Sequence, residues 1–252
     1  MCGRYTVTRQ EGLIEDLEAT LDPAAPQNEW WKPRFNVAPT QLAPVVTFDE
    51  PGLPSAAEGQ RGVVGDGTRV MKMMRWGLIP FWGTKPGTRP PLMINARVES
   101  LDAKQVFRDA LARKRCLVPA DGFFEWKRGG GKGAVPTPMW IHPEPHRFIA
   151  FAGLWARATA DSGREVLSFT IVTGPPNELV RPIHDRMPLV LDRSAWAAWL
   201  DPSLDGEGAR ALLGVPAIGD WRADEVSTWV NKADHDDPSC IVPVPAAQTS
   251  LF

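Results

Sequence analysis

The order of its short apolar segments is the feature that most limits how this 252-residue chain can fold. Gly/Pro-rich stretches separate these segments, most clearly at residues 49–68 and 83–91. Helical patterns interrupt the strand-like ones at irregular intervals, whereas a parallel α/β sheet needs a regular alternation of strand and helix. We therefore expect one α+β domain over residues 1–252, with a largely antiparallel sheet that forms a pseudo-barrel and with peripheral helices.

Hydrophobic periodicity and turn residues set the expected element boundaries. Strands are predicted at residues 42–48, 69–80, 116–119, 122–126, 147–155 and 166–173. Short helices are predicted at 10–20, 102–115, 194–200 and 206–213. Residues 21–40 are predicted to be irregular, residues 49–68 to be an insertion-like loop, and residues 239–252 to be a Pro-punctuated tail.

Charge and cysteine content exclude several classes of protein. The net charge of −2 is not that of a strongly basic nucleic-acid binder, so any contact with nucleic acid would come from a local patch. The three cysteines and four histidines lack a repeated spacing, which argues against a disulfide framework and a metal site. We expect no cofactor. Without a secretory leader or an apolar run of about 18 residues, we expect a cytoplasmic protein that contacts no membrane.

Cys2 directly follows Met1, and removal of Met1 would leave a cysteine with a free α-amine and a free thiol. Such a 1,2-aminothiol reacts with aldehydes, because the amine forms an imine and the thiol closes onto it as a thiazolidine. An α-amine titrates near about 7.7–8.0 and a lysine near about 10.4, so the α-amine is the better nucleophile at neutral pH. The alternative is that Cys2 belongs to an N-terminal tail without function.

Three polar residues lie within otherwise apolar strand-like segments: Asn95, Glu125 and His184. Each also fits a structural role, as a backbone bridge, a solvent-facing strand residue or a buried imidazole. Together with Cys2 they form a set suited to aldehyde capture. A carboxyl group among aromatic residues can have a raised pKa and move protons, His titrates near neutrality, and an amide can orient the amine. This set predicts covalent catalysis with general acid–base partners.

Seven motifs follow one another along the chain: Met1-Cys2-Gly3-Arg4-Tyr5, Asn36-Val37-Ala38-Pro39, Arg75-Trp76-Gly77-Leu78-Ile79-Pro80, Asn95-Ala96-Arg97-Val98-Glu99, Ala120-Asp121-Gly122-Phe123-Phe124-Glu125-Trp126, Ile171-Val172-Thr173 and His184-Asp185-Arg186-Met187-Pro188. In this order they resemble the SOS response-associated peptidase (SRAP) family. The resemblance extends from residue 2 to about residue 245. The segment 230–238 departs from it, because it is more acidic than the late asparagine-containing loop of the family.

The resemblance implies a protein that senses abasic sites in single-stranded DNA. It implies that Cys2, after removal of Met1, forms a thiazolidine crosslink that shields the lesion, and that Asn95, Glu125 and His184 complete the active site. The peptidase label of the family refers to removal of its own leading residue, here Met1. Strand incision through a Schiff base is a related activity of the same site. Nothing in the sequence requires an oligomer, so we expect a monomer.

Binding of single-stranded DNA requires cations for the phosphates and apolar faces for the bases. Arg4 lies near Cys2 in the sequence, and Arg97 would share a strand face with Asn95, so both are predicted phosphate ligands. The remaining predicted DNA contacts are Asn36, Trp76, Pro39 and Met93. Core packing for Trp76 and a turn-stabilising role for Asn36 are the alternatives.

Two other functions fit the same residues. A cysteine protease could use Cys2, His184 and Asn95 as nucleophile, base and orienting amide. A non-covalent reader of modified DNA bases would bind without Cys2. A blocked N-terminus separates them, because an aminothiol trap needs the free amine and a thiol protease does not.

Overall fold

The computed structural model of the chain describes residues 2–9, 12–22, 32–49, 68–80, 82, 92–129, 131, 133–159, 163–214 and 219–245. Met1, residues 50–67 of the expected loop, residues 83–91 and the last part of the expected tail lie outside the described residues.

Five strands close into a barrel: β4 (Leu42–Phe48), β5 (Arg69–Trp76), β7 (Arg115–Ala120), β10 (Ile149–Thr159) and β11 (Glu165–Gly174). Going round the barrel, β11, β10, β7, β4 and β5 pair antiparallel. The ring closes where β5 pairs with β11 in parallel, with Ser168 opposite Arg75 and Phe169 opposite Trp76. An odd number of strands cannot alternate in direction all the way round, so one pair has to be parallel. Short strands extend the barrel at its edges: β2 (Ala19–Leu21), β6 (Asn95–Arg97), β12 (Met187–Pro188) and β13 (Val190–Leu191).

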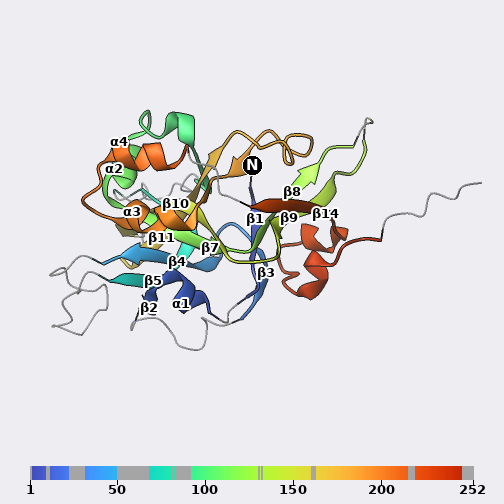
Figure 1. Cartoon of the computed structure of the whole chain (residues 1–252), viewed down its shortest axis with the longest axis horizontal. Helices are drawn as coiled ribbons and strands as arrows, with labels where there is room; N and C mark the ends of the chain where they lie inside the picture. Colours follow the sequence, from blue (N-terminus) through green and yellow to red (C-terminus); the bar gives the residue numbers. More distant parts are fainter. Residues whose placement is uncertain are drawn as a thin grey trace, which may run out of the picture.

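A five-stranded antiparallel sheet lies beside the barrel (Figure 1). Its strand order is β14 (Asp220–Glu225), β9 (Thr137–Glu144), β8 (Gly122–Lys127), β1 (Arg4–Val7) and β3 (Arg34–Val37). The chain passes from the barrel into this sheet at Asp121, between β7 and β8. One cluster of buried apolar side chains includes Tyr5 and Phe123 from the sheet and Phe151 and Phe169 from the barrel, so the two units share a core.

Four α-helices are described: α1 (Leu13–Leu17), α2 (Gln105–Arg113), α3 (Trp196–Leu200) and α4 (Gly206–Leu212). Figure 1 shows α2, α3 and α4 gathered on one side of the barrel. Single 3-10 turns are η1 (Val98–Ser100), η2 (Arg193–Ala195), η3 (Thr228–Asn231) and η4 (Pro238–Ile241). None of the helices formed by the described residues is long and apolar enough to cross a membrane.

Arg115 shows how the helices are fixed to the barrel. The residue is 5% exposed, and its guanidinium donates to five backbone carbonyl groups. These belong to Leu111, Ala112, Trp199, Asp201 and Leu204. One buried cation therefore binds the carboxyl ends of both α2 and α3, where carbonyl groups lack helical partners.

The expected α+β pseudo-barrel is confirmed by this architecture. Strand β4 has the predicted bounds, 42–48. The expectation that residues 21–40 are irregular is wrong for β3, and strands β9 and β14 have no counterpart among the predicted elements.

Candidate active site

Cys2 lies just before β1 and is fully buried. Its backbone carbonyl accepts a hydrogen bond of 2.8 Å from Asn95 Nδ2. Its thiol donates to the carbonyl oxygen of Arg4 at 3.7 Å. Burial and the nearby Glu125 raise the pKa of the thiol. The thiol therefore stays protonated until a base accepts its proton.

Glu125 comes from β8, the strand that pairs directly with β1. Because Arg4 is opposite Phe124 in this pairing, Glu125 lies level with the residues just before β1. The carboxyl group is 2% exposed, and burial raises its pKa to about 7. A carboxyl group with this pKa can act as both acid and base near neutral pH.

His184 follows the turn that leads out of β11, and its backbone N–H donates to the carbonyl of Val180 at 2.9 Å. Its Nε2 lies 3.9 Å from Glu125 Oε2. Its Nδ1 lies 3.0 Å from the backbone nitrogen of Arg186, which donates to it. Burial lowers the pKa of His184, so the ring is neutral at pH 7.

Arg186 fixes the segment that carries His184. Its guanidinium donates to both carboxylate oxygens of Glu99, at 2.6 and 2.9 Å, and to the carbonyl of Thr173 at 2.8 Å. The sequence reasoning assigned no role to Arg186. Arg186 lies two positions after His184 in the motif His184-Asp185-Arg186-Met187-Pro188, and this closeness in sequence could have pointed to a role beside His184.

Asn95 lies on β6, which pairs in parallel with β11. The side chain uses Nδ2 to hold Cys2, while its Oδ1 is buried and has no hydrogen-bond partner among the described residues. Thr173, two residues beyond the β11 partner of Asn95, likewise has a buried Oγ1 without a partner in the described part of the chain. Sequence reasoning missed Thr173. Buried acceptors without partners are uncommon and mark places where a ligand can bind.

Arg97 is exposed and follows Asn95 by two positions on β6, with the buried Ala96 between them. The alternation of burial shows that Asn95 and Arg97 share one face of this strand. This placement agrees with the predicted position of Arg97 beside the site.

Arg4 and Asn36 contact the protein itself. Arg4 Nη1 donates to Asn36 Oδ1 at 2.9 Å and to the carbonyl of Val230 at 2.8 Å, and Nη2 donates to the carbonyl of Asn231 at 3.2 Å. Asn36 is fully buried, and its Nδ2 donates to the carbonyl groups of Val230, Lys232 and His235. The structure therefore places Asn36 as a brace for the segment 228–237, which corrects its expected role as a DNA contact. We call these two side chains and that segment the brace.

Trp76 is fully buried, and its Nε1 donates to the carbonyl of Ile94 at 2.9 Å. Its ring packs edge-on against Tyr5 and stacks on Phe169. Such a ring offers no face to a base, so the stacking role expected for Trp76 is corrected to core packing. Pro39 and Met93, the two lesser candidates, are both partly buried.

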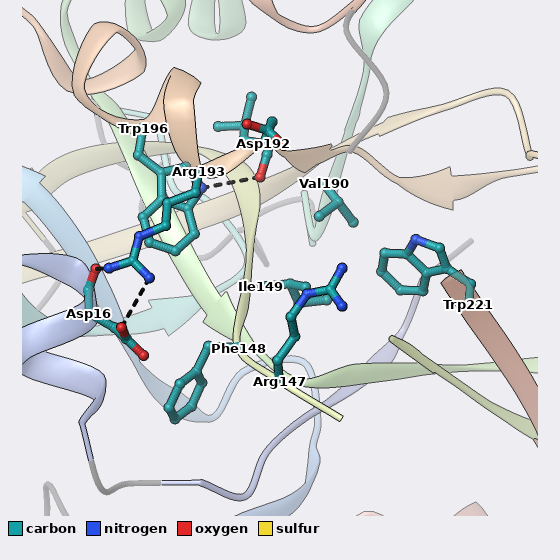
Figure 2. Close-up of a pocket in the computed structure, with 10 residues that line it drawn as sticks. Asp16, Arg147, Phe148, Ile149, Val190, Asp192, Arg193, Trp196 and Trp221 are labelled. Carbon is teal, nitrogen blue, oxygen red and sulfur yellow. Dashed lines mark hydrogen bonds and ion pairs between the residues drawn. The ribbon is translucent and has the colours of Figure 1, made fainter. Parts of the chain in front are cut away.

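A cleft of about 180 Å³ is lined by Asp16, Arg147, Phe148, Ile149, Val190, Leu191, Asp192, Arg193, Trp196 and Trp221. Figure 2 shows Arg193 bonded to Asp16 within this cleft. None of Cys2, Asn95, Glu125 and His184 lines it. Among the described residues, no group of three or more metal-ligating side chains comes together. The three cysteines are free and buried.

Comparisons with known proteins show which family the chain resembles. A family model described as SOS response associated peptidase (SRAP) matches residues 1–233. Abasic site processing protein YoqW of Bacillus subtilis (strain 168) is 36% identical over 245 residues, which cover 96% of this chain and 99% of that protein. Abasic site processing protein HMCES of Gallus gallus is 30% identical over 275 aligned positions, which cover 97% of this chain and 78% of that protein.

A crystal structure of a protein from Bacteroides thetaiotaomicron has the same fold. The TM-score is 0.77 at 23% identity, and the match covers 96% of this chain and 100% of that chain. The family match and the identities over nearly the whole chain lead to one conclusion: this chain belongs to the SOS response associated peptidase (SRAP) family.

Proposed function

We propose that this protein processes abasic sites in single-stranded DNA by forming a thiazolidine crosslink between Cys2 and the aldehyde of the lesion. Its relatives YoqW and HMCES are named abasic site processing proteins, and these names support an abasic site as the lesion. The observation that carries the chemistry is Glu125, a buried carboxyl group with a pKa of about 7, beside the thiol of Cys2. Crosslinking would shield the lesion from strand cleavage.

The reaction begins when removal of Met1 frees the α-amine of Cys2. The amine adds to the aldehyde carbon to give a carbinolamine, which loses water to form an imine. The sulfur then adds to the imine carbon and closes the five-membered ring. The amine and thiol together bring three hydrogens, of which one stays on the ring nitrogen and two leave with the aldehyde oxygen as water. The site therefore has to move protons from nitrogen and sulfur to oxygen.

Glu125 and His184 supply these proton transfers. As a carboxylate, Glu125 accepts the proton of the thiol, whose raised pKa otherwise keeps it un-ionised. As a carboxylic acid, it donates to the departing hydroxyl group. Since its pKa is about 7, both forms are populated near neutrality. His184 Nε2, at 3.9 Å, is close enough to exchange a proton with it through one water.

Asn95 positions the nucleophile. Its Nδ2 fixes the carbonyl of Cys2, and its Oδ1 remains an acceptor for an N–H of the freed amine. Arg97, exposed beside it, binds a phosphate of the strand. Pro39 and Met93 complete the proposed DNA contacts, and Arg4 acts through the brace.

The proposal includes related activities of the same site. The protein removes its own Met1, and the imine stage permits strand incision by β-elimination. We propose that it acts as a monomer in the cytoplasm. The raised pKa of the Cys2 thiol argues against a general cysteine protease, because such enzymes depend on a lowered thiol pKa.

The test is a denaturing gel of the protein with single-stranded DNA that carries one abasic site. Intact-mass measurement first establishes that the protein begins at Cys2. We expect a heat-stable shifted band from the parent protein and from Cys240→Ala, a matched change at another buried cysteine. We expect no such band from Cys2→Ala or after chemical blocking of the α-amine. Absence of a band from protein that begins at Cys2 would overturn the proposal.

A further inference from the structure

His184 lies between two carboxyl groups that differ completely in their access to water. On one side, Nε2 is 3.9 Å from Oε2 of Glu125, whose side chain is 3% exposed. On the other side, Nδ1 is 2.9 Å from Oδ1 of Asp185, whose side chain is 87% exposed. The imidazole ring therefore connects a buried carboxyl group to one that solvent can reach.

The two contacts at Nδ1 compete. The backbone N–H of Arg186, at 3.0 Å, requires Nδ1 to accept. The Asp185 carboxylate, at 2.9 Å, requires Nδ1 to carry a hydrogen and donate. A single ring nitrogen cannot do both in one protonation state. The neutral ring with its hydrogen on Nε2 satisfies Arg186, and a ring protonated on Nδ1 satisfies Asp185. Each state has a partner in place, so the ring can change state without a rearrangement of the backbone.

We propose that Asp185, His184 and Glu125 form a proton relay, in which Asp185 is a positioning residue that carries protons between water and His184. The relay rests on the proposed function, because it serves the proton transfers of crosslinking. A proton from water reaches Nδ1 of His184 by way of the Asp185 carboxylate. The resulting imidazolium gives its Nε2 proton to the Glu125 carboxylate through one water, because the two atoms are 3.9 Å apart, and the ring is neutral again with its hydrogen on Nδ1. Transfers in the opposite order return a proton to water.

The reaction needs such a relay because Glu125 has to gain and lose protons more than once, at the amine, the thiol and the departing hydroxyl group. With 2% exposure, the residue has little direct exchange with bulk water. The rate would then depend on how quickly its correct protonation state is restored. The His184 side chain is only 23% exposed, and Asp185, at 87%, adds a fully accessible group on its outer side.

The charges around the ring act in the direction that the relay requires. Burial lowers the pKa of His184, and Asp185 opposes this by stabilising the imidazolium. Burial raises the pKa of Glu125, and Asp185 raises it further. Arg128 and the α-amino group lower the pKa of His184, and the guanidinium of Arg186 is bound by Glu99. Removal of the Asp185 charge therefore lowers the pKa of both groups, so that a smaller fraction of each is protonated and able to donate at neutral pH.

The experiment compares Asp185→Asn with the parent protein. Its matched control is Asp109→Asn, which makes the same change at an exposed residue of α2. We expect single-turnover crosslinking by Asp185→Asn to be about tenfold slower at pH 7.5, with the alkaline limb of its rate profile moved to lower pH. Concentrated acetate should restore most of the rate, and Asp185→Glu should retain it. A purely structural role would give neither rescue. Parent rates for Asp185→Asn across the pH range, or a loss that acetate does not repair, would overturn the relay.

A second measurement separates the relay from the function it serves. Nitrogen-15 NMR of the ring nitrogens follows the titration of His184, which is one of only four histidines. We expect a lower midpoint for His184 in Asp185→Asn and an unchanged one in Asp109→Asn. An unchanged midpoint in Asp185→Asn overturns the relay even where crosslinking is normal. A lowered midpoint in a protein that forms no crosslink overturns the proposed function and leaves the relay in place.

Discussion

Two buried carboxyl groups lie four residues apart, one just before β8 and one within it, and their surroundings shift their pKa values in opposite directions. Asp121, just before the strand, is fully buried, and Glu125, within it, is 2% exposed. Burial alone would raise the pKa of both. The pKa of Glu125 does rise, to about 7, whereas that of Asp121 is lowered.

Hydrogen-bond donors account for the difference. Asp121 accepts from the hydroxyl of Thr6 at 2.5 Å, from the backbone and hydroxyl of Thr8 at 2.6 Å each, and from the backbone of Arg9 at 3.1 Å. His146 lies 3.8 Å away. These contacts outweigh the effect of burial and hold Asp121 ionised. A buried carboxyl group thus stays ionised where its hydrogen bonds outweigh burial, as at Asp121, and can exchange protons near neutral pH where burial prevails, as at Glu125.

Glu125→Gln should have the largest effect. The amide keeps the shape and removes the acid–base group, so we expect crosslinking to slow by about 100-fold or more while the fold persists. Single-turnover gels measure the rate and thermal unfolding checks the fold. Glu144→Gln, an exposed change on β9 of the same sheet, is the control and should react at the parent rate. A Glu125→Gln rate within twofold of the parent rate would mean that another group carries out the proton transfers of crosslinking.

Asp121→Asn should act on stability instead. The amide replaces one acceptor oxygen by a donor that faces Thr8 and Arg9, so we expect a loss of about 3 kcal/mol in the free energy of unfolding. Denaturant titration measures the loss. Crosslinking per folded molecule should stay near the parent rate. If Asp121→Asn were as stable as the parent but unable to crosslink, the distinction between the two carboxyl groups would be wrong.

The pH dependence of stability should show the smallest effect, with opposite signs for the two residues. The raised pKa of Glu125 means that the folded state binds its proton more tightly, so the parent loses stability as pH rises from about 4.5 to about 7. Glu125→Gln lacks this loss, so its stability should fall less than that of the parent between pH 4.5 and pH 8. Asp121, whose pKa is lowered, stabilises the fold above its unfolded pKa and loses this effect in acid. Denaturant titrations at pH 3, pH 4.5 and pH 8 compare all three proteins, since the Glu125 effect falls between pH 4.5 and pH 8 and the Asp121 effect falls below its unfolded pKa of about 3.9. An equal pH response of all three proteins over both intervals would contradict the opposed shifts.

Local pattern was enough to predict some elements and not others. Val106, Phe107, Ala110 and Leu111 share a helix face, and α2 spans Gln105–Arg113 within the predicted 102–115. Strand β3 lacks such a pattern and could not be predicted locally. The backbone N–H groups of Phe35 and Asn36 donate to the carboxylate of Asp236, about 200 residues away in the sequence. The polar strand β14 pairs at the sheet edge with β9, and that partner is likewise distant in sequence.

The same limit applies to the site. Residue types and neighbours within each motif identified Cys2, Asn95, Glu125 and His184, and the structure brings these four together. Asn95, Glu125 and His184 were singled out as polar residues in apolar segments, and Cys2 by its place directly after Met1. The brace could not be found this way, because Asn36 reads as a turn residue until its contacts with the segment 228–237 are seen.

The brace has a consequence for how the protein is made. Arg4, two residues after the nucleophile, takes a partner 226 positions further along the chain, at Val230. During synthesis, Cys2 leaves the ribosome long before Asn95, Glu125, His184 and Val230 exist to hold it. Cys2 is thus among the first residues to leave the ribosome, and it reaches its place in the fold only after the residues that contact it have been made. An incomplete chain would carry Cys2 without the residues that surround it in the fold. If the proposed function holds, translation to the end of the brace sets the moment at which capture of a lesion can begin.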